Sequence, residues 1–162
     1  MGIVSSTTPE TKELVVDFMK THHSGTLATS DLAGNPSASV VYFGFNDDLT
    51  ICFATKSETQ KYKNIEENKN VAFVIYDEVA QLSMQISGTV DVVRDEDARR
   101  DIIHTMFQKS AQISKRELPP AEKLYAGEYV ALKLTPTVMR MAVYARPDSQ
   151  GDDLYETLLF SK

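Results

Sequence analysis

The stretch TKSETQK combines hydroxyl side chains with lysines just where a helix is predicted to follow a strand. Ser57 and Gln60 have the spacing of a capping box, which places the predicted helix start at Ser57. The first turn of a helix presents unpaired backbone N–H groups and the positive end of the helix dipole. With the hydroxyls of Thr55 and Thr59 and the charge of Lys61, this turn has the chemistry of a phosphate seat.

The same residues also fit an ordinary solvated helix. Capped helices commonly follow strands, and Lys61 lies three residues after Glu58, with which it could form a weak surface ion pair. From the residues alone, both interpretations stay open.

Other kinds of reactive site have little support in the sequence. His22 and His23 are adjacent, so on a helix they point about 100° apart and are poorly placed to chelate one metal. Apart from these, the chain has only His104 and a single cysteine, Cys52, and no metal site is predicted. Because no nucleophile elbow, Walker loop or dinucleotide fingerprint occurs, no catalytic residue is assigned.

Length and composition favour one globular domain over residues 1–162, with 42% hydrophobic residues. The net charge of −6 argues against a nucleic-acid surface, which needs a basic footprint. No apolar run approaches the roughly 20 residues of a membrane helix, and no secretory signal is recognised. A single cysteine excludes an internal disulfide, and the expected location is therefore cytoplasmic.

The first half of the chain is predicted to be a helix followed by turn-linked strands. Thr8 and Pro9 are typical of a helix start, and the helix is expected to end at Gly25. Two strands joined by a turn at 33–36 should follow, and a second turn at 46–48 should lead into a third strand.

The second half should continue the sheet. The apolar run NVAFVIY is typical of a strand buried on both faces. A long strand follows, with Gly88 predicting a bulge or sharp bend, and Asp95 is expected to cap a second long helix.

The remaining segments are less determined. Residues 109–128 could be a lid, a dimer contact or a connecting loop, and residues 128–145 could form one or two closing strands. The apolar tail LYETLLF could pack on a partner subunit or on its own domain. Because strands linked by short turns imply an antiparallel sheet, the prediction is an α+β barrel of at least six strands with three flanking helices.

The order of four segments, GTLATSDLAGNPSASVVYF, LTICFAT, KYKNIEENKNVAF and MQISGTVDVV, resembles the pyridoxamine 5'-phosphate oxidase-like proteins. The likeness covers roughly residues 25–93, and its most specific part is the strand ending in Thr55 with Lys61 six residues later. The resemblance implies a split antiparallel β-barrel that binds FMN at the interface of a homodimer.

The resemblance also implies roles for individual residues. The second strand would run beside the flavin ring, the strand-to-helix corner would hold the ribityl and phosphate end, and a polar residue of the long strand would come from the partner chain. In that order, the implied cofactor-binding residues are Ser39, Val40, Val41, Tyr42, Ala54, Thr55, Thr59, Gln60, Lys61, and Ser83 or its neighbour Gln81.

The chain also departs from the vitamin B6 oxidase proper. That enzyme has arginines at the positions of Ser39 and Gln60, and it carries a C-terminal motif with tryptophan and histidine. This chain has no tryptophan and no histidine after His104. The resemblance is therefore to the broad flavin-binding family, and Lys56 or Lys63 could partly replace the missing charge.

The function expected from the sequence is that of an FMN-dependent oxidoreductase acting on an unidentified small molecule. The alternatives are a carrier of flavin or haem, in which His22 or His23 could ligate iron, and a deazaflavin-dependent relative.

Overall fold

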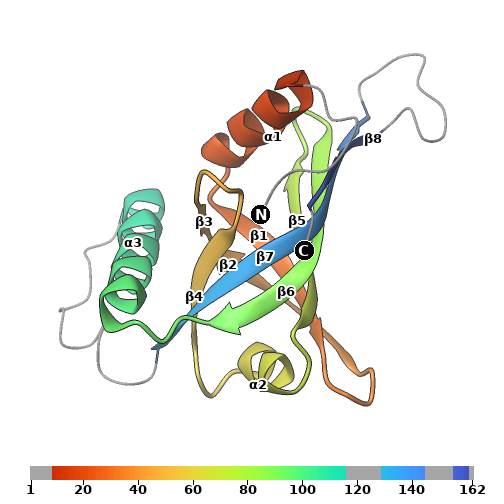
Figure 1. The fold of residues 1–162 in the computed structure, drawn as a ribbon. Helices are drawn as coiled ribbons and strands as arrows, with labels where there is room; N and C mark the ends of the chain where they lie inside the picture. Colours follow the sequence, from red (N-terminus) through yellow and green to blue (C-terminus); the bar gives the residue numbers. More distant parts are fainter. Residues whose placement is uncertain (1–8, 116–128, 145–154, 161–162) are drawn as a thin grey trace.

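One curled antiparallel sheet with three helices around it makes up residues 9–115, 129–144 and 155–160, which the computed structural model describes (Figure 1). The strand order is β2-β1-β5-β6-β7-β4-β3, with β8 also paired to β7. The predicted α+β barrel of at least six strands is confirmed. The strands are β1 (Ser24–Ser30), β2 (Pro36–Tyr42), β3 (Gly44–Phe45), β4 (Ile51–Lys56), β5 (Asn70–Asp77), β6 (Leu82–Val92), β7 (Tyr129–Val143) and β8 (Tyr155–Leu159).

One stretch of chain changes its pairing partner and so contributes to both edges of the curled sheet. β2 pairs with β1, whereas β3, only one residue further on, pairs with β4 through Gly44 opposite Cys52 and Phe45 opposite Ile51. Between β2 and β3, the backbone N–H of Phe43 donates to the carbonyl of His23 at 3.0 Å. Residues 36–45 therefore form both ends of the strand path, and the sheet is split where the partner changes.

Strand β7 is a single strand with three partners. It pairs with β6 along most of its length, with β4 through its first half and with β8 through its second half. The register with β6 shifts between Ser87 and Gly88, which confirms the bulge predicted at Gly88. β8 packs on its own domain, because Leu158 is fully buried in the core.

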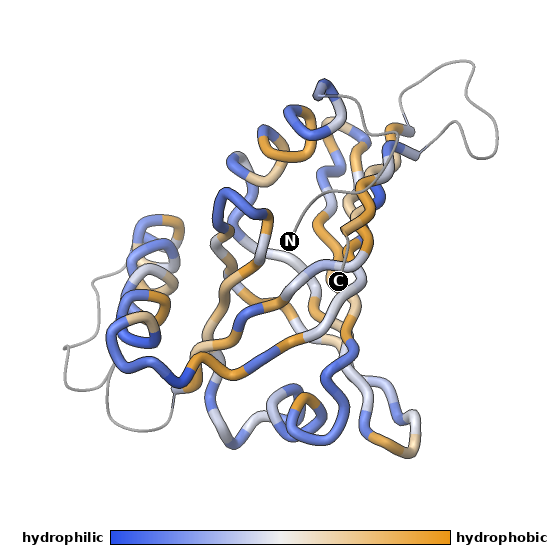
Figure 2. Tube along the Cα trace, in the orientation of Figure 1, coloured by the Kyte–Doolittle hydropathy of each residue, from blue (hydrophilic) through white to orange (hydrophobic). Residues whose placement is uncertain are grey.

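The three helices take different places around the sheet (Figure 1). They are α1 (Pro9–Thr21), α2 (Gln60–Glu67) and α3 (Glu96–Ser114). α1 and α2 lie at opposite ends of the barrel, whereas α3 lies outside it against β4 and β7. Figure 2 shows apolar residues along the strands and alternating with polar ones on the helices. None of these helices is both long and apolar enough to cross a membrane.

The helix boundaries agree in part with the prediction. α1 has Pro9 in its first turn as predicted, but it ends at Thr21, because Gly25 already belongs to β1. A Cβ on Gly25 would lie 2.5 Å from the Phe73 ring, so the glycine serves close packing in the barrel. Asp95 caps α3 as predicted, its side chain accepting from the backbone N–H of Ala98 at 2.9 Å.

The segment 109–128 is only partly covered. Its first residues, up to Ser114, extend α3, and residues 116–128 lie outside the described part of the chain.

Strand β5 differs from the prediction that both of its faces are buried. Its burial alternates strictly: Val71, Phe73 and Ile75 face the core, whereas Val74 and Tyr76 are exposed on the outer face. None of the described helices covers that outer face of β5 (Figure 1). An apolar strand with one uncovered face is a feature that a partner could complete.

Candidate functional site

The corner between β4 and α2 has a different cap from the one predicted. The helix begins at Gln60 with Thr59 as its N-cap, so the predicted start at Ser57 is wrong. The reason is a tight turn: the backbone N–H and the hydroxyl of Thr59 both donate to the carbonyl of Lys56, at 3.2 and 2.8 Å. Because of this turn, the N-cap is Thr59, two residues later than predicted.

The first turn of α2 keeps donors without an intrahelical acceptor. The Thr59 hydroxyl makes no cap hydrogen bond, and the backbone N–H groups of Tyr62 and Lys63 both donate to the Thr59 carbonyl, at 3.1 and 3.2 Å. No acceptor within the described ranges is found for the N–H groups of Gln60 and Lys61. The hydroxyls of Thr55 and Thr59 lie 3.2 Å apart at the same corner.

The charge of Lys61 is not neutralised by an ion pair within the described part of the chain. Its side chain is half-buried and makes no ion pair with residues in 9–115, 129–144 or 155–160. The surface pair with Glu58, one of the two interpretations of this lysine, does not form, because Glu58 instead lies 3.8 Å from Lys56. The corner therefore offers a cation beside uncapped N–H groups, which is a favourable arrangement for an anion.

A buried hydrogen-bond relay fixes this corner to the barrel. The Gln60 side-chain amide donates to Asn64 Oδ1 at 2.8 Å, and Asn64 Nδ2 donates to Thr29 Oγ1 on β1 at 3.0 Å. Asn64 is only 2% exposed and Thr29 only 4%. The relay was not predicted, because Asn64 and Thr29 are 35 positions apart in sequence and the pattern of α2 alone does not identify the strand it contacts.

The β2 residues assigned to the flavin ring divide between the two faces of the strand. Val40 and Tyr42 are exposed on the outer face, whereas Ser39 and Val41 point inward. The Ser39 hydroxyl oxygen is buried and has no hydrogen-bond partner among the described residues. The described residues therefore leave the Ser39 hydroxyl without a polar partner, and such an unpaired buried hydroxyl is rare and costly.

β2, β4 and α3 meet at a small hollow of about 150 Å³. Its lining joins Tyr42 and Ala54, both assigned to the flavin from the sequence, to a helix that was not assigned to it. The complete lining is Tyr42, Ala54, Met106, Phe107, Ser110 and Tyr129. The rings of Phe107 and Tyr129 meet edge to face at 5.0 Å. The periodicity of the α3 sequence alone does not show which strands Met106 and Phe107 face.

Lys109 lies close to this hollow. Its Nζ donates to the carbonyl of Phe43 at 3.0 Å, where β2 gives way to β3. Burial lowers the pKa of Lys109 from its ordinary value. The residue therefore anchors α3 at the split of the barrel.

Ser83 lies apart from the other assigned residues within one chain. It is buried on β6, which β1 and β5 separate from β2, and its hydroxyl is 3.2 Å from that of Tyr144. Its alternative, Gln81, lies just before β6 with a positive φ of 53°. The exposed polar residues of β6 are Gln85, Ser87 and Asp91, and the nearest of them to Ser83 is Gln85, two positions later.

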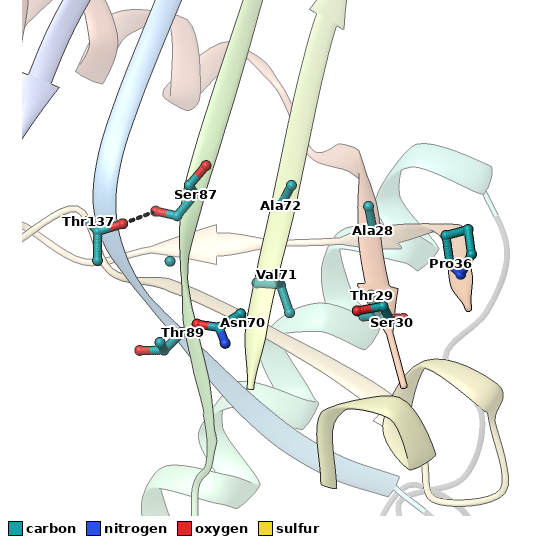
Figure 3. Close-up of a pocket in the computed structure, with 11 residues that line it drawn as sticks. Ala28, Thr29, Ser30, Pro36, Asn70, Val71, Ala72, Ser87, Thr89 and Thr137 are labelled. Atoms are coloured by element: carbon teal, nitrogen blue, oxygen red, sulfur yellow. Dashed lines mark hydrogen bonds between the residues drawn. The ribbon is translucent and has the colours of Figure 1, made fainter. Parts of the chain in front are cut away.

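A larger hollow lies elsewhere, on the outer side of β1, β5 and β6, with a volume of about 490 Å³ (Figure 3). Thr137 on β7 donates to the carbonyl of Ser87 at its edge, at 3.1 Å. None of the eleven residues that line it is charged, so it lacks the cation that a phosphate would favour. They are Ala28, Thr29, Ser30, Pro36, Asn70, Val71, Ala72, Ser87, Gly88, Thr89 and Thr137.

His22, considered above as an iron ligand, has both ring nitrogens occupied. Nδ1 lies 2.7 Å from the carbonyl of Phe18, and Nε2 lies 3.3 Å from a carboxylate oxygen of Asp77. The ring also stacks on Phe18 with centroids 4.1 Å apart. The described residues contain no group of three or more His, Cys, Asp or Glu side chains that could hold a metal.

Comparison with known proteins gives a family match over most of the chain. A model of the family described as pyridoxamine 5'-phosphate oxidase matches residues 11–142. A pyridoxine/pyridoxamine 5'-phosphate oxidase from Burkholderia thailandensis is 32% identical over 75 residues, which cover 46% of this chain and 35% of that protein. The chain thus spans about a third of the length of the curated relatives it matches.

Solved structures share the fold at low sequence identity. An FMN binding protein related to pyridoxamine 5'-phosphate oxidase, from Nostoc punctiforme, has a TM-score of 0.67 and 13% identity, covering 97% of this chain and 99% of its own. A haem binding protein from Mycobacterium smegmatis has a TM-score of 0.68 and 16% identity, covering 94% of this chain and 59% of its own.

Proposed function

Because the chain belongs to the pyridoxamine 5'-phosphate oxidase family, we propose that it binds FMN as a homodimer and acts as an FMN-dependent oxidoreductase on a small molecule. The observation that carries the proposal is the corner before α2, where first-turn N–H groups without an acceptor lie beside the half-buried cation of Lys61. The Nostoc punctiforme protein of the same fold, described as FMN binding, supports the choice of cofactor.

The described residues fit FMN at both of its ends. At the corner, a phosphate would accept from the N–H groups of Gln60 and Lys61, beside the Lys61 ammonium. Along β2, the outward side chains of Val40 and Tyr42 offer an apolar surface to a flat ring.

A bound flavin supplies hydride or electron transfer at its ring, and the protein supplies position and electrostatics. The hollow beside Tyr42 and Ala54 is where a substrate could meet that ring, and its volume of about 150 Å³ suits a group of the size of one aromatic ring. Met106, Phe107 and Tyr129 would exclude water from it.

The outer face of the sheet supports the homodimer. Val40 and Val74 both lie opposite Thr26 in register, so they flank it on one face, and they are 70% and 38% exposed. Tyr76, on the same face of β5, is 60% exposed. Apolar side chains gathered on an uncovered sheet face are typical of an interaction surface. We assign it to a second copy, whose Gln85 would reach the flavin instead of the engaged Ser83.

Val74→Asp is expected to raise the dimer dissociation constant by at least about tenfold, because each protomer would bring an unpaired charge to the interface. Sedimentation equilibrium of the variant and the parent protein over a range of concentrations measures the effect. Val79→Asp is the matched control, since Val79 lies in the turn between β5 and β6 and is 96% exposed. A Val74→Asp protein that associates as tightly as the control would contradict this interface.

The absorption spectrum tests the cofactor. The purified protein, or the protein after FMN addition and removal of the excess, should retain flavin bands, and NADH or NADPH should bleach them if the protein is an oxidoreductase. A Soret band would support the haem-carrier alternative instead. A protein that stays colourless after incubation with FMN would overturn the proposed function, and uptake of a deazaflavin alone would correct the cofactor.

A further inference from the structure

The relay from Thr29 through Asn64 to Gln60 controls which end of the Gln60 amide faces the phosphate corner. In the structure, Gln60 Nε2 is committed to Asn64 Oδ1 at 2.8 Å, and Asn64 Nδ2 is committed to Thr29 Oγ1 at 3.0 Å. The free end of the Gln60 amide is therefore its oxygen. A carbonyl oxygen only accepts hydrogen bonds, so this end is unfavourable toward an anion.

The same three side chains can also form the relay with donors and acceptors exchanged, while the side chains stay at the same distances from one another. A threonine hydroxyl both donates and accepts, and a side-chain amide exchanges its donor and acceptor ends by a half-turn about its last torsion. In the reversed relay, the Thr29 hydroxyl donates to Asn64 Oδ1, and Asn64 Nδ2 donates to Gln60 Oε1. The relay contains two hydrogen bonds in either direction. The two states therefore differ mainly in whether the free end of the Gln60 amide is its oxygen or its N–H₂ group.

Burial couples the two amides. Asn64 is 2% exposed and Thr29 is 4% exposed, so water is not available to satisfy a relay in which only one amide has turned. A mismatched relay would leave a buried polar atom without a partner, which is costly. Gln60, by contrast, is exposed at the first turn of α2, where a ligand can reach its free end.

We propose that a phosphate monoester at the corner reverses this relay, and that Asn64 is the positioning residue that turns the Gln60 amide so that its N–H₂ faces the phosphate. The inference rests on the proposed FMN site at the same corner. It adds a specificity: FMN reverses the relay, whereas riboflavin, which lacks the phosphate, leaves it in its present direction.

The direction of the relay can be observed by NMR on the full chain, free, with riboflavin and with FMN. Without ligand and with riboflavin, the Asn64 side-chain NH₂ protons should show nuclear Overhauser contacts to the Thr29 methyl group. With FMN, those contacts should be replaced by contacts to the Gln60 γ-methylene protons. Contacts to Thr29 that persist in the FMN complex would overturn the inference.

Gln60→Ala tests the energetic consequence. It should weaken FMN affinity about fivefold, the equivalent of one hydrogen bond, and leave riboflavin affinity unchanged, because only the phosphate contact is lost. Glu67→Gln, at the other end of α2, is the control and should change neither affinity. Loss of both affinities in Gln60→Ala, or of neither, would contradict a role at the phosphate.

The two proposals fail differently. If the parent protein binds FMN more tightly than riboflavin but Gln60→Ala keeps that preference, the relay inference is overturned and the FMN site stands. If the parent protein binds FMN no better than riboflavin, the phosphate corner itself is wrong, and the relay inference is overturned with it.

Discussion

Replacing Lys61 with alanine is expected to weaken FMN binding about 10- to 150-fold without changing the free energy of unfolding. A hydrogen bond to a charged group contributes about 1.5–3 kcal/mol, which corresponds to that range of affinity. Lys61 has no ion pair within the described part of the chain, so its removal should leave no partner charge unsatisfied. Flavin fluorescence titration measures the affinity, and urea unfolding of the flavin-free protein measures the stability.

Two further variants sharpen this test. Lys61→Arg keeps the cation and should retain most of the affinity. Lys69→Ala removes a lysine beyond the far end of α2, where Lys69 pairs with Asp91 at 2.6 Å, and should leave FMN affinity unchanged. If Lys61→Ala and Lys69→Ala bind FMN equally well, the corner does not hold the phosphate.

Gly88→Ala is expected to destabilise the protein by at least about 3 kcal/mol, or to prevent it from folding. A Cβ at this position would lie 2.2 Å from the carbonyl oxygen of Thr135 and 3.0 Å from the Cα of Pro136. These are backbone atoms of β7, so relief requires the two central strands to separate at the bulge. The cost then combines overpacking, typically about 1–3 kcal/mol, with lost strand-pairing hydrogen bonds. Soluble yield and urea unfolding measure it.

Gly44→Ala is the matched control for this substitution. The nearest atom to its Cβ would be Met106 Cε at 3.2 Å, the far end of a flexible side chain that can move aside. Its cost should stay below about 1 kcal/mol, in the range of small overpacking changes. A Gly88→Ala protein as stable as Gly44→Ala would show that the strands do not approach so closely at the bulge.

The order of strands and helices could be predicted because its signals are local. Pro9 and Asp95 act within a turn of their own helices, and the irregularity at Gly88 follows from a residue that lacks a side chain. The alternation of β5 was obscured, because Val74 and Tyr76 on its outer face are apolar like the residues of its core face. A strand whose outer face is covered only in an assembly has the same composition as one buried in a single chain.

The candidate site could be predicted only in part because its decisive contacts join distant residues. The position of Lys61 was identified by resemblance, but the true cap, Thr59, depends on hydrogen bonds to the Lys56 carbonyl that the residue types do not specify. The hollow beside Tyr42 needs α3, which the sequence provides without its orientation. The proposed use of Gln85 in place of Ser83 is a shift by one side-chain period, which a strand pattern alone does not resolve.

Strand β7, which pairs with three other strands, also determines when the protein can complete its fold during synthesis. β1 and β2, and likewise β5 and β6, can pair as hairpins soon after they leave the ribosome. β4 has only the two residues of β3 on one side, and its other neighbour is β7, which begins at Tyr129. The corner that follows β4 therefore gains its supporting strand late in synthesis, and FMN loading is expected only after β7 has emerged.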